Sequence, residues 1–517
     1  IDLRDRSGIT QVVFHPEVNQ DVAKASQQLR SEDMIQISGT VAARLKTDTV
    51  DTTNADLPTG EIEVSADTLN VINKADVLPF QLDRALSNED LRLKYRFLDL
   101  RRPAMARNMQ IRHRVTKATR DYLDEHGFLE IETPILSKST PEGARDFLVP
   151  SRLAPGKFYA LPQAPQQYKQ LLMVAGMERY FQIARCFRDE DLRADRQPEF
   201  TQVDIEASFI TPEDIYNLVE GLLKRVYKES LGVDIPTPFP RMTWKEAMDQ
   251  YGSDKPERRF GMKLTDVSSI FENSGFKVFA SAVSNGGVVK AINAKGFGSA
   301  SVGQIDALTK TAVEAGAKGL AYIKVREEDW RSPISKFLSD EEKQKLTEAL
   351  DIETGDLVLF AAGPWEPSCD ILGRVRLQCA EFMELLKDNK ERDFLWVIEF
   401  PLVGWDEEEQ RWVAIHHPFT RPVKEDEQKL LSGELSADLR AQAYDVVLNG
   451  TELGGGSIRI HERDLQSAMF KALGITEEQA REQFGHILDA FSFGAPPHGG
   501  YDKAITFEFS HFMSPQS

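Results

Sequence analysis

One segment constrains the fold more than any other: a charged loop between two stretches that read as strands. After the loop, four apolar residues alternate with four polar ones: Val203, Ile205, Ala207 and Phe209 against Gln202, Asp204, Glu206 and Ser208. A period of two over eight residues predicts a strand, so we expect an antiparallel hairpin with strands at 179–188 and 200–209. A face with two carboxylates and an amide, beside an arginine-rich loop, is unusual for a strand that only meets solvent. This face is therefore a candidate site.

The charge of the chain limits the kinds of partner. The net charge of −19 argues against a protein that coats nucleic acid through overall basicity. Residues 91–120 nevertheless hold ten basic side chains and a single acid, Asp99. This local excess has two interpretations: a solvated helix face, or a surface for a phosphate backbone.

Cysteine content and apolar runs bear on the compartment. The three cysteines, Cys186, Cys369 and Cys379, are odd in number and lack metal-type spacing, so we expect a reducing cytoplasm. No run approaches the ~18 apolar residues of a membrane span, which predicts no membrane partner. The first residues alternate like a strand already in progress, so we expect the chain to begin inside a domain.

The first part of the chain reads as a small β-barrel followed by a hinge. At roughly 150 residues per domain, 517 residues suggest about three domains. Residues 1–74 predict short strands at 8–14, 34–43, 60–64 and 67–72, with one helix at 18–30, which is compatible with an oligonucleotide-binding (OB) barrel. Residues 75–103 read as the hinge.

The remainder predicts an interrupted domain. A long helix over 104–126, anchored by Tyr122, Leu123 and Phe128 and stopped by Gly127, opens a first part at 104–261. Residues 262–362 differ in texture and predict an inserted α+β module, with proline and glycine at both edges. Strand patterns return in 363–500, at 394–400, 412–416 and 456–460.

The chain lacks the common glycine-rich motifs that bind nucleotide phosphates. It lacks a Walker loop, a GxGxxG after a strand, HExxH and GxSxG, so a nucleotide would be held by side chains on strands. Three glycines at 454–456, bracketed by Glu452 and Arg459, indicate close backbone approach or a bulge. A flexible turn with surface charges is the alternative. His416 and His417 are adjacent, so on a strand they would point to opposite faces and would not easily share one metal ion.

Together these stretches closely resemble the bacterial-type aspartyl-tRNA synthetases, a class II family, from Ile1 to Gly500. Residues 128–136 with Pro134 resemble motif 1 at the dimer interface, and residues 188–200 resemble motif 2. Residues 139–146, 159–170 and 416–420 resemble blocks that line the aspartate pocket. The resemblance implies an α+β fold: a class II antiparallel-sheet catalytic domain, an N-terminal OB-type barrel and an inserted α+β domain.

The resemblance also implies the reaction and its residues. ATP and Mg²⁺ would serve the formation of aspartyl-adenylate, and tRNA(Asp) would accept the aspartyl group, with tRNA(Asn) open as a second acceptor. The implied ATP-binding residues are Arg188, which is also catalytic, Asp189, Glu190, Gln197, Phe200 and Glu452. The implied aspartate-binding residues are Glu142, Gln166, Lys169, Arg188, Asp204, His416 and Arg459. Asp445 and Glu452 would hold the metal ion, Gln11, Arg44 and Glu63 would read the anticodon, and a homodimer is expected.

Two departures from the family leave alternatives open. The family begins about one strand pair before Ile1, so the first part of the barrel is expected to be missing. Residues 501–517 stand where the family has motif 3, with its Gly-x-Asp-Arg segment. One alternative is an aspartate-activating relative that acts on another acceptor. The other is a non-catalytic tRNA-binding protein.

Overall fold

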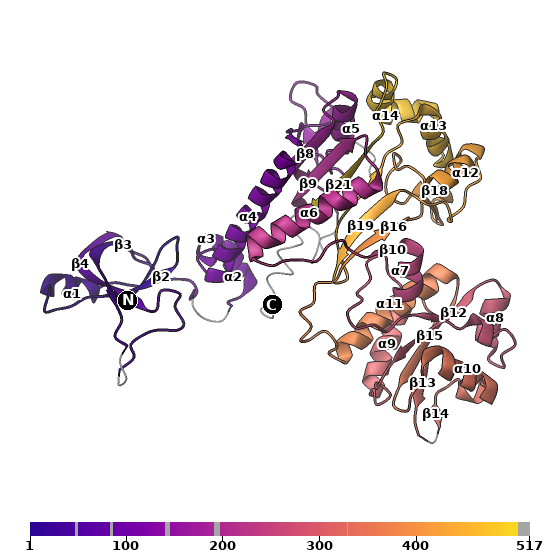
Figure 1. Ribbon diagram of the computed structural model, residues 1–517, viewed down its shortest axis with the longest axis horizontal. Coiled ribbons are helices and arrows are strands. Elements are labelled where there is room, and N and C mark those ends of the chain that lie inside the picture. The colour runs from indigo at the N-terminus through magenta and orange to yellow at the C-terminus, as the bar shows by residue number, and fades with distance from the viewer. Residues whose placement is uncertain (47–49, 83–85, 140–144, 191–196, 328, 505–517) are drawn as a thin grey trace. The chain divides into compact units, whose positions relative to one another are not determined.

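The computed structural model describes residues 1–504 apart from 47–49, 83–85, 140–144, 191–196 and 328. The chain divides into two compact units, Ile1–Ala106 and Arg107–Ser517, and Figure 1 labels their elements. Among the described helices, none is both long enough and apolar enough to cross a membrane.

The first unit is built on a four-stranded sheet in the order β1-β2-β4-β3. The strands are β1 (Asp2–Arg4), β2 (Ile9–Val13), β3 (Met34–Ala43) and β4 (Ile62–Asn73). The prediction of two strands at 60–64 and 67–72 is wrong, because β4 continues through Ser65 and Ala66, and Ala66 is buried. The register against β3 shifts between Ser38 and Gly39. At Gly39 a Cβ atom would lie 2.2 Å from the Ser65 carbonyl oxygen, so a glycine is needed here.

Short helices complete this unit. The helix expected over 18–30 is only α1 (Gln20–Ser26), which Asn19 caps by accepting from the amides of Asp21 and Val22. Beyond the sheet lie α2 (Glu89–Lys94) and α3 (Arg96–Asp99). A small apolar cluster of Phe80, Leu82 and Leu98 supports them.

The second unit contains an eight-stranded sheet in the order β10-β16-β19-β20-β21-β9-β8-β5. The strands are β5 (Leu129–Glu130), β8 (Arg179–Phe187), β9 (Glu199–Ser208), β10 (Arg241–Thr243), β16 (Phe394–Ile398), β19 (Ala443–Leu448), β20 (Thr451–Ile458) and β21 (His498–Ala504). All neighbours are antiparallel except β10 with β16 and β5 with β8 at the two edges. The predicted hairpin is β8 and β9. Phe209 lies outside the strand, at φ 59° and 70% exposed, so the prediction that it continues the face of Val203, Ile205 and Ala207 is wrong.

Two long helices, α4 (Pro103–Glu125) and α6 (Pro212–Leu231), cover one face of this sheet (Figure 1). Their apolar residues share a core with the inward residues of β9, including Val203 and Ile205. The predicted anchors Tyr122, Leu123 and Phe128 belong to this core, which confirms the interpretation of α4. Because β9 alternates, Asp204 and Glu206 must emerge on the opposite face of the sheet.

The opposite face carries the helix α5 (Gln166–Val174) and a C-terminal group of helices. These are α12 (Glu427–Ser432), α13 (Arg463–Ala472) and α14 (Glu477–Phe491). A separate apolar cluster with Phe419, Phe470 and Phe484 holds α13 and α14 together. Smaller elements are β6 (Leu148–Pro150), β7 (Phe158–Ala160), α7 (Trp244–Tyr251), β17 (Val403–Asp406) and β18 (Arg411–Ala414).

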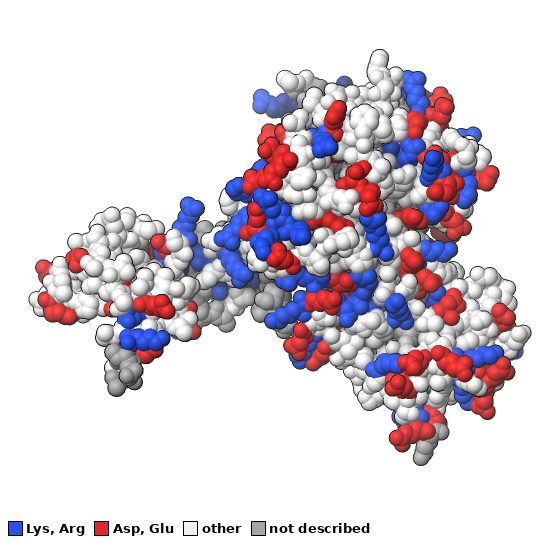
Figure 2. Space-filling view, in the orientation of Figure 1, with Lys and Arg blue, Asp and Glu red and all other residues white. Residues whose placement is uncertain are grey.

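The inserted segment forms its own five-stranded sheet in the order β11-β12-β15-β13-β14. Its elements are β11 (Thr265–Asp266), α8 (Lys277–Ser284), β12 (Val288–Ala294), α9 (Val302–Glu314), β13 (Ala321–Val325), β14 (Trp330–Arg331), α10 (Asp340–Leu350) and β15 (Leu357–Gly363). The helix α11 (Trp365–Phe382) follows the expected boundary, yet Leu372 and Val375 pack in the same core as Ile292 and Leu359. Acidic and basic side chains are interspersed over this module in Figure 2.

The segment expected to diverge from the family starts inside a central strand. Tyr501 and Asp502 belong to β21, which fills the sheet position between β20 and β9. Tyr501 is completely buried in the core under α4 and α6. The alternating residues Ile505, Phe507 and Phe509 lie outside the described residues.

Candidate active site

The polar face of β9 is buried, not solvated. Asp204 and Glu206 have no exposed surface, and α5 places Lys169 between them. Lys169 Nζ lies 2.5 Å from Asp204 Oδ1 and 3.6 Å from Glu206 Oε2. Buried charges require partners, so this lysine allows two carboxylates to stand in the interior of the domain.

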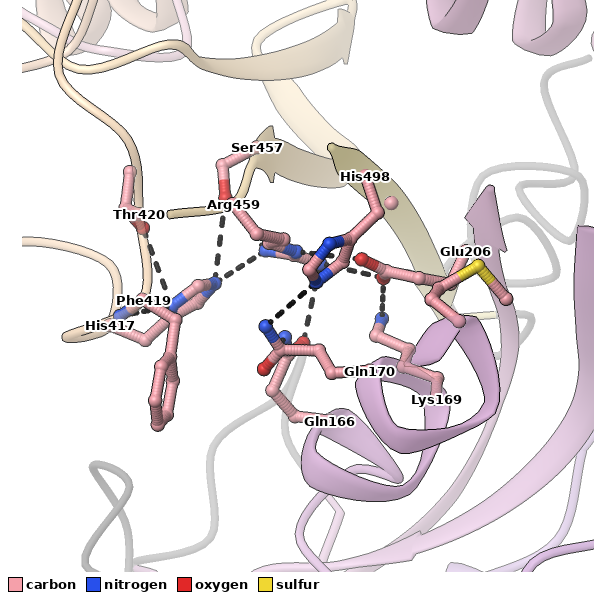
Figure 3. Close-up of polar contacts among 12 residues, drawn as sticks. Gln166, Lys169, Gln170, Glu206, His417, Phe419, Thr420, Ser457, Arg459 and His498 are labelled. Atoms are coloured by element: carbon pink, nitrogen blue, oxygen red, sulfur yellow. Dashed lines mark hydrogen bonds and ion pairs between the residues drawn. The ribbon is translucent and has the colours of Figure 1, made fainter. Parts of the chain in front are cut away.

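Arg459, just after β20, is 2% exposed and is the second buried cation of this group, beside Lys169. Its Nε and Nη2 atoms donate to the two oxygens of Glu206, both at 3.1 Å. This is a bidentate pair, the geometry that suits arginine and carboxylate best. Figure 3 shows the guanidinium at the centre of a polar cluster drawn from α5, β9, β20 and the loop after β18.

The other nitrogens of Arg459 also meet protein groups. Nη1 lies 2.6 Å from Ser457 Oγ and 2.5 Å from His417 Nε2, and Nη2 lies 3.3 Å from Gln166 Oε1. Deeper in the site, Gln170 Nε2 lies 3.1 Å from His498 Nε2. The guanidinium is therefore held in one orientation by several elements of the fold.

Glycines make room for the buried carboxylates. A Cβ on Gly455 would lie 1.9 Å from Asp445 Oδ1, and one on Gly500 would lie 1.9 Å from Glu206 Oε2. A Cβ on Gly456 would meet the Gly500 carbonyl oxygen at 2.0 Å. The expectation of close backbone approach at 454–456 is thus confirmed, and the register of β20 shifts at the Val446–Val447 step of β19.

Burial and neighbouring charges shift the pKa values of the two carboxyl groups on β9. Desolvation raises the pKa of Asp204 to about 6, against the lowering effect of Lys169. Desolvation also acts on Glu206, but Arg459 and Lys169 outweigh it and lower the pKa of Glu206. Asp204 Oδ2 is buried and has no hydrogen-bond partner among the described residues. That oxygen is an acceptor suited to a donor on a ligand.

A second acidic group lies on β19 and β20. Asp445 and Glu452 line the same cavity as Gln166, His417 and Arg459. The cavity has a volume of about 1220 Å³, and Asp502 of β21 also lines it. Desolvation raises the pKa of both Asp445 and Glu452. Repulsion from Glu452, Asp254 and Asp502 raises the pKa of Asp445 further, and repulsion from Asp254 and Asp502 raises that of Glu452. Two carboxylates that repel one another suit a hard divalent cation such as Mg²⁺.

Apart from Glu452 on β20, the expected nucleotide residues belong to the hairpin that resembles motif 2. The Arg188 guanidinium stands 5.0 Å from the Phe200 ring centroid, a cation–π contact. The Arg188 amide donates to the Pro198 carbonyl across the hairpin, and the Asp189 amide donates to the Arg145 carbonyl. Glu190 and Gln197 follow in the same loop region. Glu142 lies outside the described residues.

The two adjacent histidines have different surroundings. His416 packs edge-on against Phe400 and presents surface to the cavity, where desolvation lowers its pKa to about 4. His417 faces Arg459. Sequence reasoning selected His416 and did not select Glu206, His417, Ser457, Gln170 or His498. Three of these residues had a signal in the sequence: Glu206 shares the polar face of β9 with Asp204, and Gln170 and His417 lie in the stretches 159–170 and 416–420 that resemble pocket-lining blocks.

The first unit brings its three candidate residues together. Gln11 of β2 donates to Glu63 Oε2 of β4 at 3.2 Å, and Arg44 Nε lies 3.6 Å from the same oxygen. Residues 11, 44 and 63 thus form one polar group on the sheet.

Several members of the basic stretch 91–120 have acidic or polar partners. Arg92, Arg96 and Arg102 all surround the buried Asp99, at 3.6, 2.7 and 3.3 Å. Arg120 pairs with Glu130 through two nitrogens. The structure therefore uses part of this charge within the fold.

Comparison with known proteins gives the class. Residues 88–506 match the model of tRNA synthetases class II (D, K and N), and residues 1–72 match that of the OB-fold nucleic acid binding domain. An asparaginyl-tRNA synthetase from Pyrococcus horikoshii in complex with asparaginyl-adenylate shares the fold, with a TM-score of 0.59 at 18% identity over 100% of this chain and 88% of that one. A putative aspartyl-tRNA synthetase from Leishmania major gives a TM-score of 0.58 at 17% identity, over 100% and 85%.

Relatives with known names narrow the class. An aspartate–tRNA(Asp/Asn) ligase from Opitutus terrae is 56% identical over 508 residues, 97% of this chain and 84% of the relative. The enzyme of the same name from Bacillus subtilis is 56% identical over 503 residues, with the same coverage. The chain therefore belongs to the class II tRNA synthetases and, within them, to the aspartate–tRNA ligase family. The expected α+β class II fold with an N-terminal OB domain is confirmed.

Proposed function

We propose that this chain ligates L-aspartate to tRNA(Asp) in two steps, using ATP and passing through aspartyl-adenylate. The observation that carries the proposal is the buried Arg459, oriented by Glu206 on the floor of a large cavity. A guanidinium edge beside a buried lysine fits the side-chain carboxylate of aspartate.

The remaining pocket fits the backbone groups of an amino acid. Asp204 Oδ2 is buried without a partner among the described residues and suits the substrate ammonium. Lys169 pairs with the other oxygen of this carboxylate, Gln166 and His416 line the cavity, and Glu142 is assigned to the pocket by resemblance. Desolvation raises the pKa of Asp204. The positive charge of a substrate ammonium nearby would oppose this effect and favour the ionised carboxylate.

In the first step the α-carboxylate of aspartate attacks the α-phosphate of ATP, and pyrophosphate leaves. Arg188 would neutralise charge on the α-phosphate, while Phe200 would stack on the adenine; Asp189, Glu190 and Gln197 would contact the nucleotide. Asp445 and Glu452 would hold Mg²⁺, which supplies charge neutralisation on the phosphates. Positioning and electrostatics carry such a displacement.

In the second step a hydroxyl of the terminal adenosine of the tRNA attacks the aspartyl carbonyl, and AMP leaves. The polar group of Gln11, Arg44 and Glu63 would read the anticodon on the OB domain, which splays single-stranded bases. The names of the two relatives include tRNA(Asn), so tRNA(Asn) is proposed as a second acceptor to be tested.

The structure also offers support for a homodimer. The edge strand β5 belongs to the segment that resembles motif 1, and this segment exposes Leu129, Ile135 and Leu136 at 51%, 49% and 53%. Exposed apolar residues at a sheet edge favour association. The division into domains at 74, 103, 261, 362 and 500 and the cytoplasmic location stay predictions.

Two assays test the function and separate the alternatives. Aspartate-dependent ATP–pyrophosphate exchange reports the first step, and attachment of labelled aspartate to tRNA reports the second. We expect both activities, with Mg²⁺ required. Exchange without attachment to tRNA(Asp) or tRNA(Asn) would favour a relative that acts on another acceptor. Tight tRNA binding without exchange would favour a non-catalytic protein.

A further inference from the structure

Four buried side chains form a hydrogen-bond network that leads from the cavity wall into the core of the domain (Figure 3). Arg459 Nη2 donates to Gln166 Oε1 at 3.3 Å, and Gln166 Nε2 donates to Gln170 Oε1 at 3.2 Å. Gln170 Nε2 lies 3.1 Å from His498 Nε2, and His498 Nδ1 lies 2.8 Å from the Pro496 carbonyl oxygen. The four side chains are at most 6% exposed, so they must satisfy one another's polar atoms.

The carbonyl at the inner end gives the network one direction. A carbonyl oxygen only accepts, so a neutral His498 carries its proton on Nδ1 and its lone pair on Nε2. Desolvation by burial lowers the pKa of His498, which favours the neutral form. The lone pair requires the NH₂ group of Gln170, and the oxygen of Gln170 then faces the NH₂ group of Gln166. In this direction every donor of the network meets an acceptor.

The outer end of the network requires the same direction. An arginine nitrogen only donates, so Arg459 requires the oxygen of the Gln166 amide on its side. An amide turned the other way would place its NH₂ group against the guanidinium, and two donors would face one another. The inner and outer ends therefore agree, and the Gln166 amide has one favourable orientation before a ligand binds.

Gln166 is the member of the network through which an amide orientation reaches the cavity. It lines the cavity, whereas Gln170 and His498 do not belong to the described residues that line it. An NH₂ group has two hydrogens, and Gln170 accepts one from Gln166. The other hydrogen can donate to a carboxylate oxygen of a bound amino acid.

The backbone of His498 supports this arrangement. His498 is the first residue of β21, and its carbonyl oxygen accepts the Arg459 backbone amide at 2.9 Å. Its ring packs against Phe491, with the ring centroids 6.0 Å apart. One residue of β21 thus holds Arg459 directly through the main chain and indirectly through the two glutamines.

We propose that His498 is a positioning residue for the amino-acid pocket: acting through Gln170, it fixes the Gln166 amide with its oxygen toward Arg459 and thereby raises the affinity for the substrate. This inference rests on the proposed function, in which Gln166 contacts aspartate. The alternative is a histidine that only fills the core, and such a residue would affect stability without a selective effect on aspartate.

The test compares two amide replacements of His498 by calorimetric titration of the full chain with L-aspartate. His498→Asn keeps a donor for Pro496 but has no acceptor that reaches Gln170, so aspartate binding should weaken by about tenfold. His498→Gln places an amide oxygen near the position of Nε2 and should restore most of the affinity. ATP affinity should not change in either variant. His113→Asn on α4, an exposed histidine, is the matched control.

Two further measurements separate positioning from core filling. Gln170→Leu should weaken aspartate binding by a similar factor, and His498→Asn should add little in that background, because the network is already interrupted. In pyrophosphate exchange, His498→Asn should raise the KM for aspartate and change kcat by less than about twofold, as expected for a loss of ground-state binding. Losses that multiply in the double variant would show a structural role and overturn the inference.

The outcomes distinguish this inference from the proposed function. If His498→Asn keeps its melting temperature and binds aspartate as the parent does, the inference is wrong while the function stands. If the variants do not fold, imidazole nitrogen shifts in the ¹⁵N-histidine spectrum of the parent decide. They should show the Nδ1–H tautomer of His498, and an Nε2–H tautomer would contradict the network. A parent chain that does not bind aspartate would overturn both.

Discussion

The two sides of the cavity handle buried charge in opposite ways. On the side proposed for the amino acid, Lys169 and Arg459 lie against Asp204 and Glu206, so each of these buried charges has a counter-charge within the protein. On the side proposed for the metal ion, Asp445 and Glu452 lie among further acids, and repulsion from Asp254 and Asp502 adds to desolvation. The first side is completed by folding, whereas the second is completed by a ligand.

This difference explains how one sheet can hold some of its buried charges in fixed positions and still bind a ligand with others. Internal pairing fixes Arg459 before the substrate arrives, which limits the entropy lost on binding. A divalent cation would relieve the repulsion among these carboxylates, so we expect its binding to depend on pH and to stabilise the folded chain. The comparison predicts large structural effects on the first side and ligand-dependent effects on the second.

The largest effect is expected from Glu206→Ala. This change leaves two buried cations, Arg459 and Lys169, without the carboxylate that they share. Removing one partner of a buried charge network costs about 3–5 kcal/mol. The free energy of unfolding, measured by urea denaturation, should fall by that amount. Glu206→Gln keeps the shape and one acceptor and should lose less; a loss below about 1 kcal/mol in the alanine variant would contradict the account.

Arg459→Lys should come next, and it acts on function more than on stability. Lysine keeps the positive charge but loses the planar fork that binds a carboxylate through parallel donors. The loss of two charge-assisted hydrogen bonds, at about 1.5–3 kcal/mol each, sets the upper limit of the effect. Within this limit we expect aspartate-dependent exchange to fall by roughly 10²-fold. ATP binding should stay as in the parent. Retention of most of the exchange activity would show that Arg459 does not select the substrate.

Asp445→Asn should have a smaller effect whose sign depends on Mg²⁺. The folded chain raises the pKa of Asp445, so it retains a proton that the unfolded chain releases. Stability is therefore lost as the pH rises from the unfolded pKa through the raised one. In chelator at neutral pH, the variant should be more stable than the parent, because it carries no carboxyl group whose ionisation the folded chain opposes.

The same variant should lose the stabilisation that Mg²⁺ gives to the parent. Thermal unfolding with EDTA or Mg²⁺, measured from pH 5 to pH 8, shows both effects. Leu448→Met, on the same strand, serves as a control because it leaves the carboxylates in place. A parent whose stability rises with pH in EDTA more steeply than that of the variant would contradict the assignment.

The smallest effect is expected outside the cavity, from Gln11→Ala. This change removes the hydrogen bond to Glu63 and one candidate contact to the tRNA. Attachment of aspartate to tRNA should weaken by about tenfold, at ~1–1.5 kcal/mol for one hydrogen bond. Pyrophosphate exchange should not change, since it needs no tRNA. An equal loss in both assays would place the effect in folding instead of tRNA binding.

Local patterns in the sequence predicted the elements that carry the site. The alternation after residue 199 placed Asp204 and Glu206 on one face, and the triple glycine indicated close packing of strands. These signals work because a strand has a side-chain period of two and because a glycine lacks Cβ. The long amphipathic helix α4 was predictable for the same local reason.

Features that depend on distant residues were not predictable. The pair of Arg459 and Glu206 joins residues 253 positions apart in the sequence, and no local pattern marks it. The packing of α11 in the core of the inserted module was missed for the same reason. A helix packs against apolar surface even where proline and glycine residues suggest a domain boundary. The prediction for Phe209 was wrong because alternation does not show where a strand ends. Here β9 ends before Phe209, which has a left-handed backbone conformation.

The central claim is that the amino-acid side of the cavity is built, before any ligand binds, for a carboxylate. The most direct measurement is the exchange rate of the unmodified chain with L-aspartate and with L-asparagine, at saturating ATP and Mg²⁺. The account predicts a ratio of kcat/KM of at least about 10³ in favour of aspartate, as expected of sites that pair buried polar groups with their ligand. A ratio near unity would contradict it.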